Sequence, residues 1–134
     1  MGFDLTGIKA KNTKGEYFRN NVWYWRRLWE FVEMTCSTIL SEEDIIKGNF
    51  NDGHKITAKK ADQMVIILKK SIKDGFAKKY SDHVSEEIKI AKANNKTHKM
   101  GDPKHNWNES YPFTIINLKE FITFVENSGG FRIY

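Results

Sequence analysis

Over most of this chain, apolar residues recur every three or four positions. Residues 20–38 have the most distinctive version of this pattern, with the apolar positions Trp25, Leu28, Trp29, Val32 and Cys36. Because a helix turns once every 3.6 residues, side chains with this spacing lie on one face. The sequence therefore predicts an aromatic-rich helix whose apolar face is buried.

Four further helices are predicted from the same period and from residues that begin or end helices. Ser41 and Asp44 can form a capping box for a short helix over Glu42–Lys47, and Gly48 can end it. The longer helices are predicted from Thr57 to Gly75, from Phe76 to about Asn95, and from Thr114 or Asn117 to Ser128. Residues 96–112 hold both prolines and form the longest predicted loop, a length often associated with function.

The two ends of the chain have the alternating pattern of β-strands. Apolar and polar side chains alternate over residues 3–8, before a turn-forming stretch at 12–15, and again over residues 131–134. No internal repeat or linker divides the chain, so a single domain over residues 1–134 is expected. The predicted fold class is α+β, mainly α, with four to five helices and a small antiparallel two-stranded ribbon from the N- and C-termini.

The amino-acid composition indicates in which cellular compartment such a domain would be found and which kinds of partner it would bind. Cys36 is the one cysteine in 134 residues, so an internal disulfide cannot form and a reducing, cytoplasmic compartment is expected. The first residues lack the apolar run of a signal peptide, and no 18 successive residues are apolar and uncharged, so neither secretion nor a membrane span is expected. The net charge of +5 favours anionic partners, although surplus lysine can also serve solubility alone.

The densest cluster of polar and aromatic residues lies at residues 15–26. Arginine binds phosphate oxygens through two N–H groups, and aromatic rings stack on nucleobases. On a helix, Arg19, Trp23 and Arg26 would share one face, with Asn20 and Asn21 as polar neighbours. The alternative is that the tryptophans of this stretch are core residues and the arginines extend from its rim.

A second cluster, from Asn51 through Asp52 and Gly53 to His54, precedes the helix that Thr57 is predicted to cap. Amides at a helix N-terminus favour an anion, and Asp52 would bind ribose hydroxyls. The alternative is a plain turn followed by a cap, which needs no ligand.

The sequence contains no recognisable catalytic or metal-binding motif. The four histidines lack metal-ligand spacing and cysteine partners, so a structural zinc site is not expected. Cys36 continues an apolar helical stripe, where a thiol is usually inert. Since phosphate-binding glycine loops and nucleophile motifs are also absent, we expect no catalytic residue, no cofactor and no metal.

Three segments carry a resemblance: GEYFRNNVWYWRRLW, NFNDGHKI and the closing stretch from YPF to NSGGFRIY. Through them the chain resembles a family of small, largely uncharacterised phage and bacterial proteins, for which no catalytic role is assigned. Relatives often have proline in place of Arg27, which implies a helix starting nearer that position and a loop or strand over residues 19–26. The resemblance implies a phage or mobile-element origin, the cytoplasm of a bacterial host cell and an anti-defence role.

These observations lead to one hypothesis and two rivals. We predict a non-enzymatic protein that sequesters a small anionic immune signal of the cyclic nucleotide or ADP-ribose type. A homodimer that shares the site across its interface fits a protein of this size. Its predicted ligand-binding residues are Arg19, Asn20, Asn21, Trp23, Arg26, Asn51, Asp52, His54 and Trp107, with His105 and Asn106 closing over the site. The first rival is an inhibitor, like an anti-CRISPR protein, of a host defence protein or nucleic acid. The second is a nucleotide-processing enzyme that uses Asp52 and His54 as acid and base.

Overall fold

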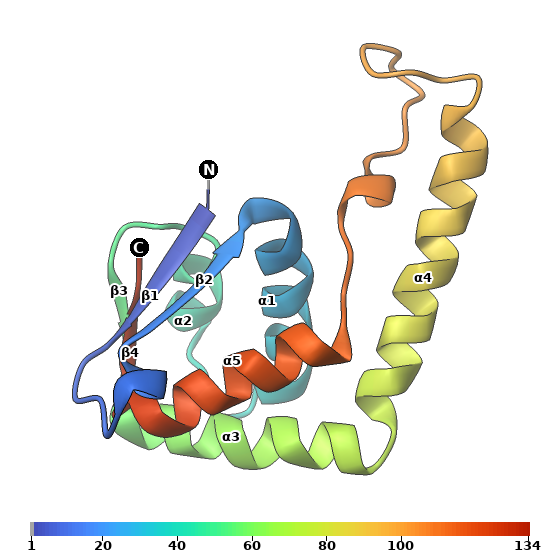
Figure 1. Cartoon of the computed structure of the whole chain (residues 1–134). Coiled ribbons are helices and arrows are strands. Elements are labelled where there is room, and N and C mark those ends of the chain that lie inside the picture. The colour runs from blue at the N-terminus through green and yellow to red at the C-terminus, as the bar shows by residue number, and fades with distance from the viewer. Residues whose placement is uncertain (1) are drawn as a thin grey trace.

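Polar side chains set the start of four of the five helices that the structure describes over residues 2–134. Asn21, Ser41, Thr57 and Thr114 each accept a hydrogen bond from a backbone amide three residues further on. At Ser41 the predicted capping box is confirmed, since the Asp44 carboxylate also binds the Ser41 amide. The helices of this computed structural model are α1 (Val22–Cys36), α2 (Glu42–Lys47), α3 (Ala58–Lys73), α4 (Phe76–Asn95) and α5 (Ile115–Ser128) (Figure 1).

Four antiparallel strands form one sheet in the order β2-β1-β4-β3. They are β1 (Gly2–Gly7), β2 (Tyr17–Asn21), β3 (His54–Ile56) and β4 (Phe131–Ile133). The predicted ribbon between the chain ends is confirmed, because β1 pairs with β4 and places Leu5 opposite Ile133. The sheet is larger than predicted, since β2 pairs with the other edge of β1 and β3 with the other edge of β4.

Two segments expected to be helix or turn belong to these added strands. Residues 19–21 complete β2, and α1 begins only at Val22, with Asn21 as its cap. The prediction that Arg19 shares a helical face with Trp23 and Arg26 is therefore wrong. In the same way, His54 leaves the predicted turn and begins β3.

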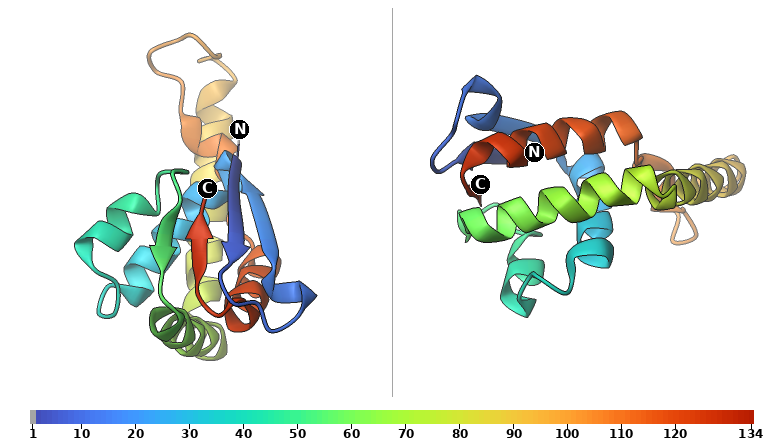
Figure 2. Two further views of the ribbon diagram at one scale, coloured as in Figure 1. Left: turned by 90° about the vertical axis from the view of Figure 1, so that its left-hand side faces the viewer. Right: turned by 90° about the horizontal axis from the view of Figure 1, so that it is seen from below.

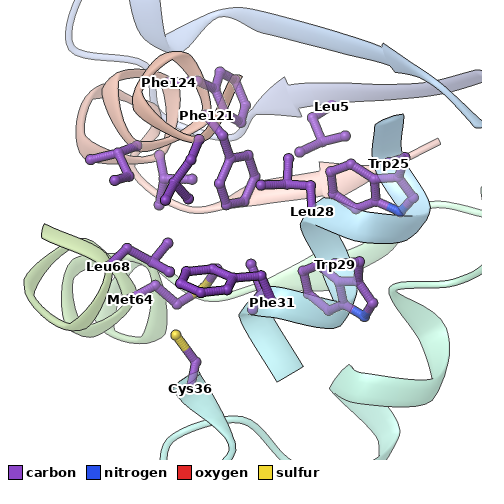
Figure 3. Close-up of a cluster of buried hydrophobic side chains, with 14 of the residues drawn as sticks. Leu5, Trp25, Leu28, Trp29, Phe31, Cys36, Met64, Leu68, Phe121 and Phe124 are labelled. Carbon is purple, nitrogen blue, oxygen red and sulfur yellow. The ribbon is translucent and has the colours of Figure 1, made fainter. Parts of the chain in front are cut away.

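Two of the three tryptophans of α1, Trp25 and Trp29, are core residues, whereas Trp23 is partly exposed. Trp25 and Trp29 are fully buried and stack with their ring centroids 5.5 Å apart (Figure 3). A buried indole N–H needs an acceptor. Trp25 Nε1 donates to Gly48 O at 2.8 Å, and Trp29 Nε1 donates to Ile45 O at 3.0 Å. They belong to one core with apolar side chains of the sheet and of α1, α3 and α5, among them Leu5, Leu28, Phe31, Met64, Leu68, Phe121 and Phe124.

The sheet is covered on one side only, and α4 projects from the body. Figure 2 (left) faces the four strands, and the helices lie behind or beside them. The turn between α3 and α4 has Gly75 at a φ of +86°, a conformation that glycine adopts without strain. Beyond the body, α4 carries residues 96–106 at its tip, and the chain returns through a 3-10 turn at Trp107–Ser110 (Figure 1). We call residues 86–110 the arm.

Arg27 fixes the base of the arm to α1. Its buried guanidinium donates from Nη2 to Glu87 Oε2 at 2.7 Å and from Nε to Tyr111 O at 3.1 Å. Glu30 lies beside it and accepts a hydrogen bond of 2.9 Å from the Tyr80 hydroxyl. Three segments, α1, α4 and the chain returning from the arm, therefore meet at one side chain.

Candidate functional site

The residues of the first predicted cluster face different directions. Arg19 lies on the open side of the sheet, where its Nη1 is 2.7 Å from Asp4 Oδ1. Asn20 points into the molecule and exchanges two side-chain hydrogen bonds of 2.9 Å with Asn117. Asn21 caps α1. The contacts of Asn20 and Asn21 are therefore those of structural residues.

Trp23 and Arg26 lie near the start of α1, beside the chain returning from the arm. Trp23 is 38% exposed and packs edge-on against Tyr111, with ring centroids 5.0 Å apart. Arg26 makes one long hydrogen bond, 3.4 Å from its Nη1 to Asn49 Oδ1. Through this bond Arg26, a residue of the first predicted cluster, contacts Asn49, which lies just before the second predicted cluster at Asn51.

The side chains of the second predicted cluster, Asn51, Asp52 and His54, do not converge on one site. Asn51 and Asp52 are exposed, and Asp52 pairs with Lys47 at 3.2 Å. His54 turns to a different carboxylate, since its Nε2 lies 2.8 Å from Asp44 Oδ1. The acid and base pair that the enzymatic rival requires, Asp52 with His54, is not assembled in this arrangement.

The buried carboxylate of Asp44 links stability to pH. Burial alone would raise its pKa, but hydrogen bonds from Lys60, His54 and Ser41 outweigh burial and lower the pKa to about 2 from the usual 3.8. A carboxyl whose pKa is lower in the folded state stabilises the fold above its unfolded pKa, and this contribution is lost as the pH falls through the folded value. We expect about 2 kcal/mol of unfolding free energy to disappear between roughly pH 5 and pH 2.

Urea unfolding across this pH range, on the wild type and two variants, measures the contribution. Asp44→Asn should lack it, whereas Asp52→Asn removes an exposed carboxylate and should keep it, because exposed ion pairs contribute little. If Asp44→Asn kept the full acid dependence of the wild type, the assignment to Asp44 would be wrong.

Five surface hollows described over residues 2–134 show whether the two predicted clusters line a common site. Arg19, Asn20 and Asn21 line one of them with residues of α5, and Arg26 lines another with Tyr111. None of the five is lined by both predicted clusters. Arg19, Asn20 and Asn21 are separated from the second cluster because β2, which carries them, and β3, which follows residues 51–53, form opposite edges of the sheet.

One hollow, on the arm, combines cations with aromatic side chains. It has a volume of about 440 Å³ and is lined by Lys92, Asn95, Lys96, Lys99, Met100, His105, Trp107, Glu109 and Ser110. We call it the arm hollow. Lys92 and Lys96 are one helical turn apart and so share a side of α4, and Trp107 is 45% exposed. A larger hollow of about 610 Å³ has three lysines of α3 in its lining but no aromatic residue.

Asn95 builds one wall of the arm hollow. Its buried side chain donates from Nδ2 to Asn106 O at 2.9 Å and to Glu109 Oε2 at 2.7 Å, and its Oδ1 accepts from the Asn106 amide at 2.9 Å. Asn94 Nδ2 adds a hydrogen bond of 2.8 Å to Lys104 O. These bonds hold the returning chain against α4 and so shape the hollow.

The rings of His105 and Trp107 lie edge-on, with centroids 4.7 Å apart. His105 Nδ1 donates to His98 O at 2.8 Å, which leaves Nε2 as the nitrogen that can meet a ligand. The carboxylate of the lining, Glu109, is already hydrogen-bonded to Asn95. The arm hollow therefore offers positive charge, an aromatic surface and an imidazole nitrogen.

Sequence reasoning identified Trp107 and the neighbouring His105 and Asn106, but it missed Lys92, Lys96 and Lys99 as site residues. The available signal was the four-residue step from Lys92 to Lys96, directly before a loop with aromatic residues.

The described residues give little indication of metal binding, of a reactive thiol or of a membrane-spanning helix. Within residues 2–134 no three His, Cys, Asp or Glu side chains are grouped to hold a metal ion. Burial raises the pKa of the Cys36 thiol to about 11, which leaves it protonated and poorly nucleophilic at neutral pH. None of the helices described in this range combines the length and apolar character that crossing a membrane requires.

Comparison of the chain with models of protein families, with curated proteins and with solved structures found no match.

Proposed function

We propose that the protein binds a small anionic ligand with a flat ring, of the nucleotide type, in the arm hollow and does not alter it. The observation that carries this proposal is the lining, which places three lysines beside a half-exposed tryptophan on one preformed hollow. Lysine ammonium groups neutralise phosphate, and an indole ring stacks on a nucleobase.

The size and charge of the arm hollow fit such a ligand. Its volume of about 440 Å³ lies within the range of about 300–1,000 Å³ typical of small-molecule sites. The lining contains three lysines and one carboxylate, Glu109. This carboxylate already accepts a hydrogen bond from Asn95. Because Asn95 fixes the wall in advance, little ordering of the protein is needed on binding.

This proposal keeps the predicted ligand class and moves its site. Of the predicted ligand-binding residues, only Trp107 lines the arm hollow, together with His105, which was predicted to close over the site. Cyclic nucleotides and ADP-ribose derivatives have the chemistry that the lining favours. That the ligand is an immune signal sequestered by a phage-encoded protein stays a prediction.

Replacing Trp107 with alanine is expected to weaken nucleotide binding at least about fivefold, because stacking on an aromatic side chain contributes about 1–3 kcal/mol per base. Calorimetric titration with AMP, cyclic AMP, a cyclic dinucleotide and ADP-ribose, alongside adenosine and inorganic phosphate, separates the contribution of the ring from that of the charge. Trp23→Ala is the matched control, since Trp23 is also partly exposed but lies outside the arm hollow.

Lysine variants test the electrostatic half of the proposal. Lys92→Gln and Lys96→Gln should weaken the phosphate-bearing ligands and leave adenosine unchanged, and Lys89→Gln, on the same helix but outside the lining, should bind normally. The proposed site would be wrong if Trp23→Ala lost binding and Trp107→Ala kept it. Failure of all the nucleotides to bind the wild type would refute the function, and chromatographic recovery of altered nucleotide would refute the non-enzymatic role.

A further inference from the structure

A second surface, far from the arm, has the composition of a binding face. Strand residues alternate sides, so residues such as Leu5 and Ile133 point into the core while their neighbours point out. We call the outward set the open sheet face: Asp4, Thr6, Tyr17, Arg19, Lys55, Arg132 and Tyr134. In Figure 2 (left) no helix lies in front of these strands.

The strand register arranges this face in two rows. In one row Asp4 lies between Arg19 and Tyr134, because Asp4 pairs with Arg19 in the register and exchanges backbone hydrogen bonds of 2.8 and 2.7 Å with Tyr134. In the other row Thr6 lies between Tyr17 and Arg132, and Lys55 follows Arg132 on β3. Neighbouring strands are about 4.8 Å apart and residues about 3.4 Å apart along a strand, so the two tyrosines, two strands and one row apart, have backbones separated by roughly 12 Å.

Both tyrosine rings are accessible and positioned. Tyr17 is 55% exposed, and its hydroxyl donates to Asp4. Tyr134 is 46% exposed and its ring lies against Gly53, where a Cβ atom would come within 3.1 Å of the ring. Rings held in this way can stack on a flat partner with little loss of side-chain freedom.

The charge of the open sheet face is positive. Arg19, Lys55 and Arg132 are three cations against one carboxylate, Asp4, which is engaged by Arg19 and Tyr17. Arg132 also donates to Gly53 O at 3.1 Å, and Lys55 has no ion pair within the described residues 2–134. The partner that matches this surface is an anion with exposed rings, extended enough to cross four strands.

We propose that the open sheet face binds single-stranded nucleic acid, with bases stacked on Tyr17 and Tyr134 and phosphates near Arg19, Lys55 and Arg132. Single strands suit this face because their bases are free to stack, whereas those of a duplex are enclosed. Recognition of this kind depends on rings and charge and so tolerates different sequences. It is independent of the arm hollow and of the small ligand proposed for it.

Fluorescence anisotropy with labelled 12-residue oligomers of dT and rU, and with a duplex of the same length, tests the proposal. We expect the single strands to bind more tightly than the duplex. Tyr17→Ala and Tyr134→Ala should each weaken binding of the single strands at least about fivefold, whereas Tyr17→Phe should retain binding. With about three phosphates neutralised, affinity should fall roughly twentyfold between 50 and 200 mM salt, and Arg132→Gln should flatten this dependence.

Control variants locate the binding. Tyr24→Ala removes a partly exposed tyrosine outside the open sheet face, and Trp107→Ala alters the arm hollow, so both should bind the single strands normally. Circular dichroism verifies that each variant is folded. The proposal is overturned if wild type does not bind at 50 mM salt, if Trp107→Ala rather than the tyrosine variants loses binding, or if polyglutamate competes as well as an unlabelled oligomer, which would indicate an acidic protein partner.

Discussion

Arg27→Met is expected to lower the free energy of unfolding by about 3 kcal/mol, the lower end of the effect of breaking a buried ion pair. The change removes the hydrogen bonds to Glu87 and to the Tyr111 carbonyl and leaves both acceptors without that partner. We place the effect at the lower end because Glu87 is 29% exposed and water can partly replace the guanidinium. Urea unfolding followed by circular dichroism measures it.

The next residue supplies the control. Arg26→Met removes the same charge from an exposed position with one long hydrogen bond, and it should change stability by no more than about 0.5 kcal/mol. Adding Glu87→Gln to Arg27→Met should recover part of the loss, because the carboxylate that lacks its guanidinium partner is then replaced by a neutral amide. Equal stability of the Arg27→Met and Arg26→Met variants would show that the guanidinium does not hold the arm.

Gly48→Ala is expected to destabilise the fold by about 3 kcal/mol, the upper end of typical overpacking effects. The backbone at Gly48 has helical φ and ψ angles that alanine also adopts, so conformation is not the obstacle. A Cβ atom there would lie 1.9 Å from the Trp29 ring, which is fully buried and hydrogen-bonded to Ile45 O. The indole cannot retreat without losing that bond and its stacking on Trp25.

Thermal unfolding gives the size of this effect, with an expected fall in Tm of about 10 °C for a domain of this length. Trp29→Leu removes the ring that causes the clash, so the cost of Gly48→Ala should be clearly smaller in the Trp29→Leu background than in the wild type. The same cost in both backgrounds would place the origin of the destabilisation elsewhere.

The helices and the terminal ribbon could be predicted from the sequence because their signals are local. The stripe that contains Trp25 and Trp29 sets the buried face of α1, and Ser41 with Asp44 sets the start of α2 within one turn of chain. The residue pattern did not predict strands β2 and β3, for the opposite reason, although the family resemblance implied a loop or strand over residues 19–26. β3 is three residues long, and inward positions of β2 include a polar residue, Asn20, whose partner Asn117 lies 97 positions away.

The candidate site was harder to predict than the fold, because a polar side chain has the same appearance in a sequence whether it binds a ligand or another residue. His54 and Asn20 were interpreted as ligand-binding, but long-range contacts with Asp44 and Asn117 account for them in the structure. Conversely, the sequence pattern did not identify Lys92 and Lys96 as site residues. They become part of a hollow only because Asn95, between them, holds the chain that returns past Trp107.

The separation of the arm from the core implies two levels of stability within one chain. Ala91 and Asn95 are buried by the returning chain but do not belong to the main apolar cluster, so the outer arm can open locally while the sheet and α1 stay intact. Backbone amides in the arm then exchange with solvent deuterium through this local opening, and those of α1 exchange only on global unfolding. A ligand bound in the arm hollow should make this local opening rarer and so slow amide exchange in residues 86–110. The exchange rates of the arm should therefore respond more strongly to ligand binding than the melting temperature of the core.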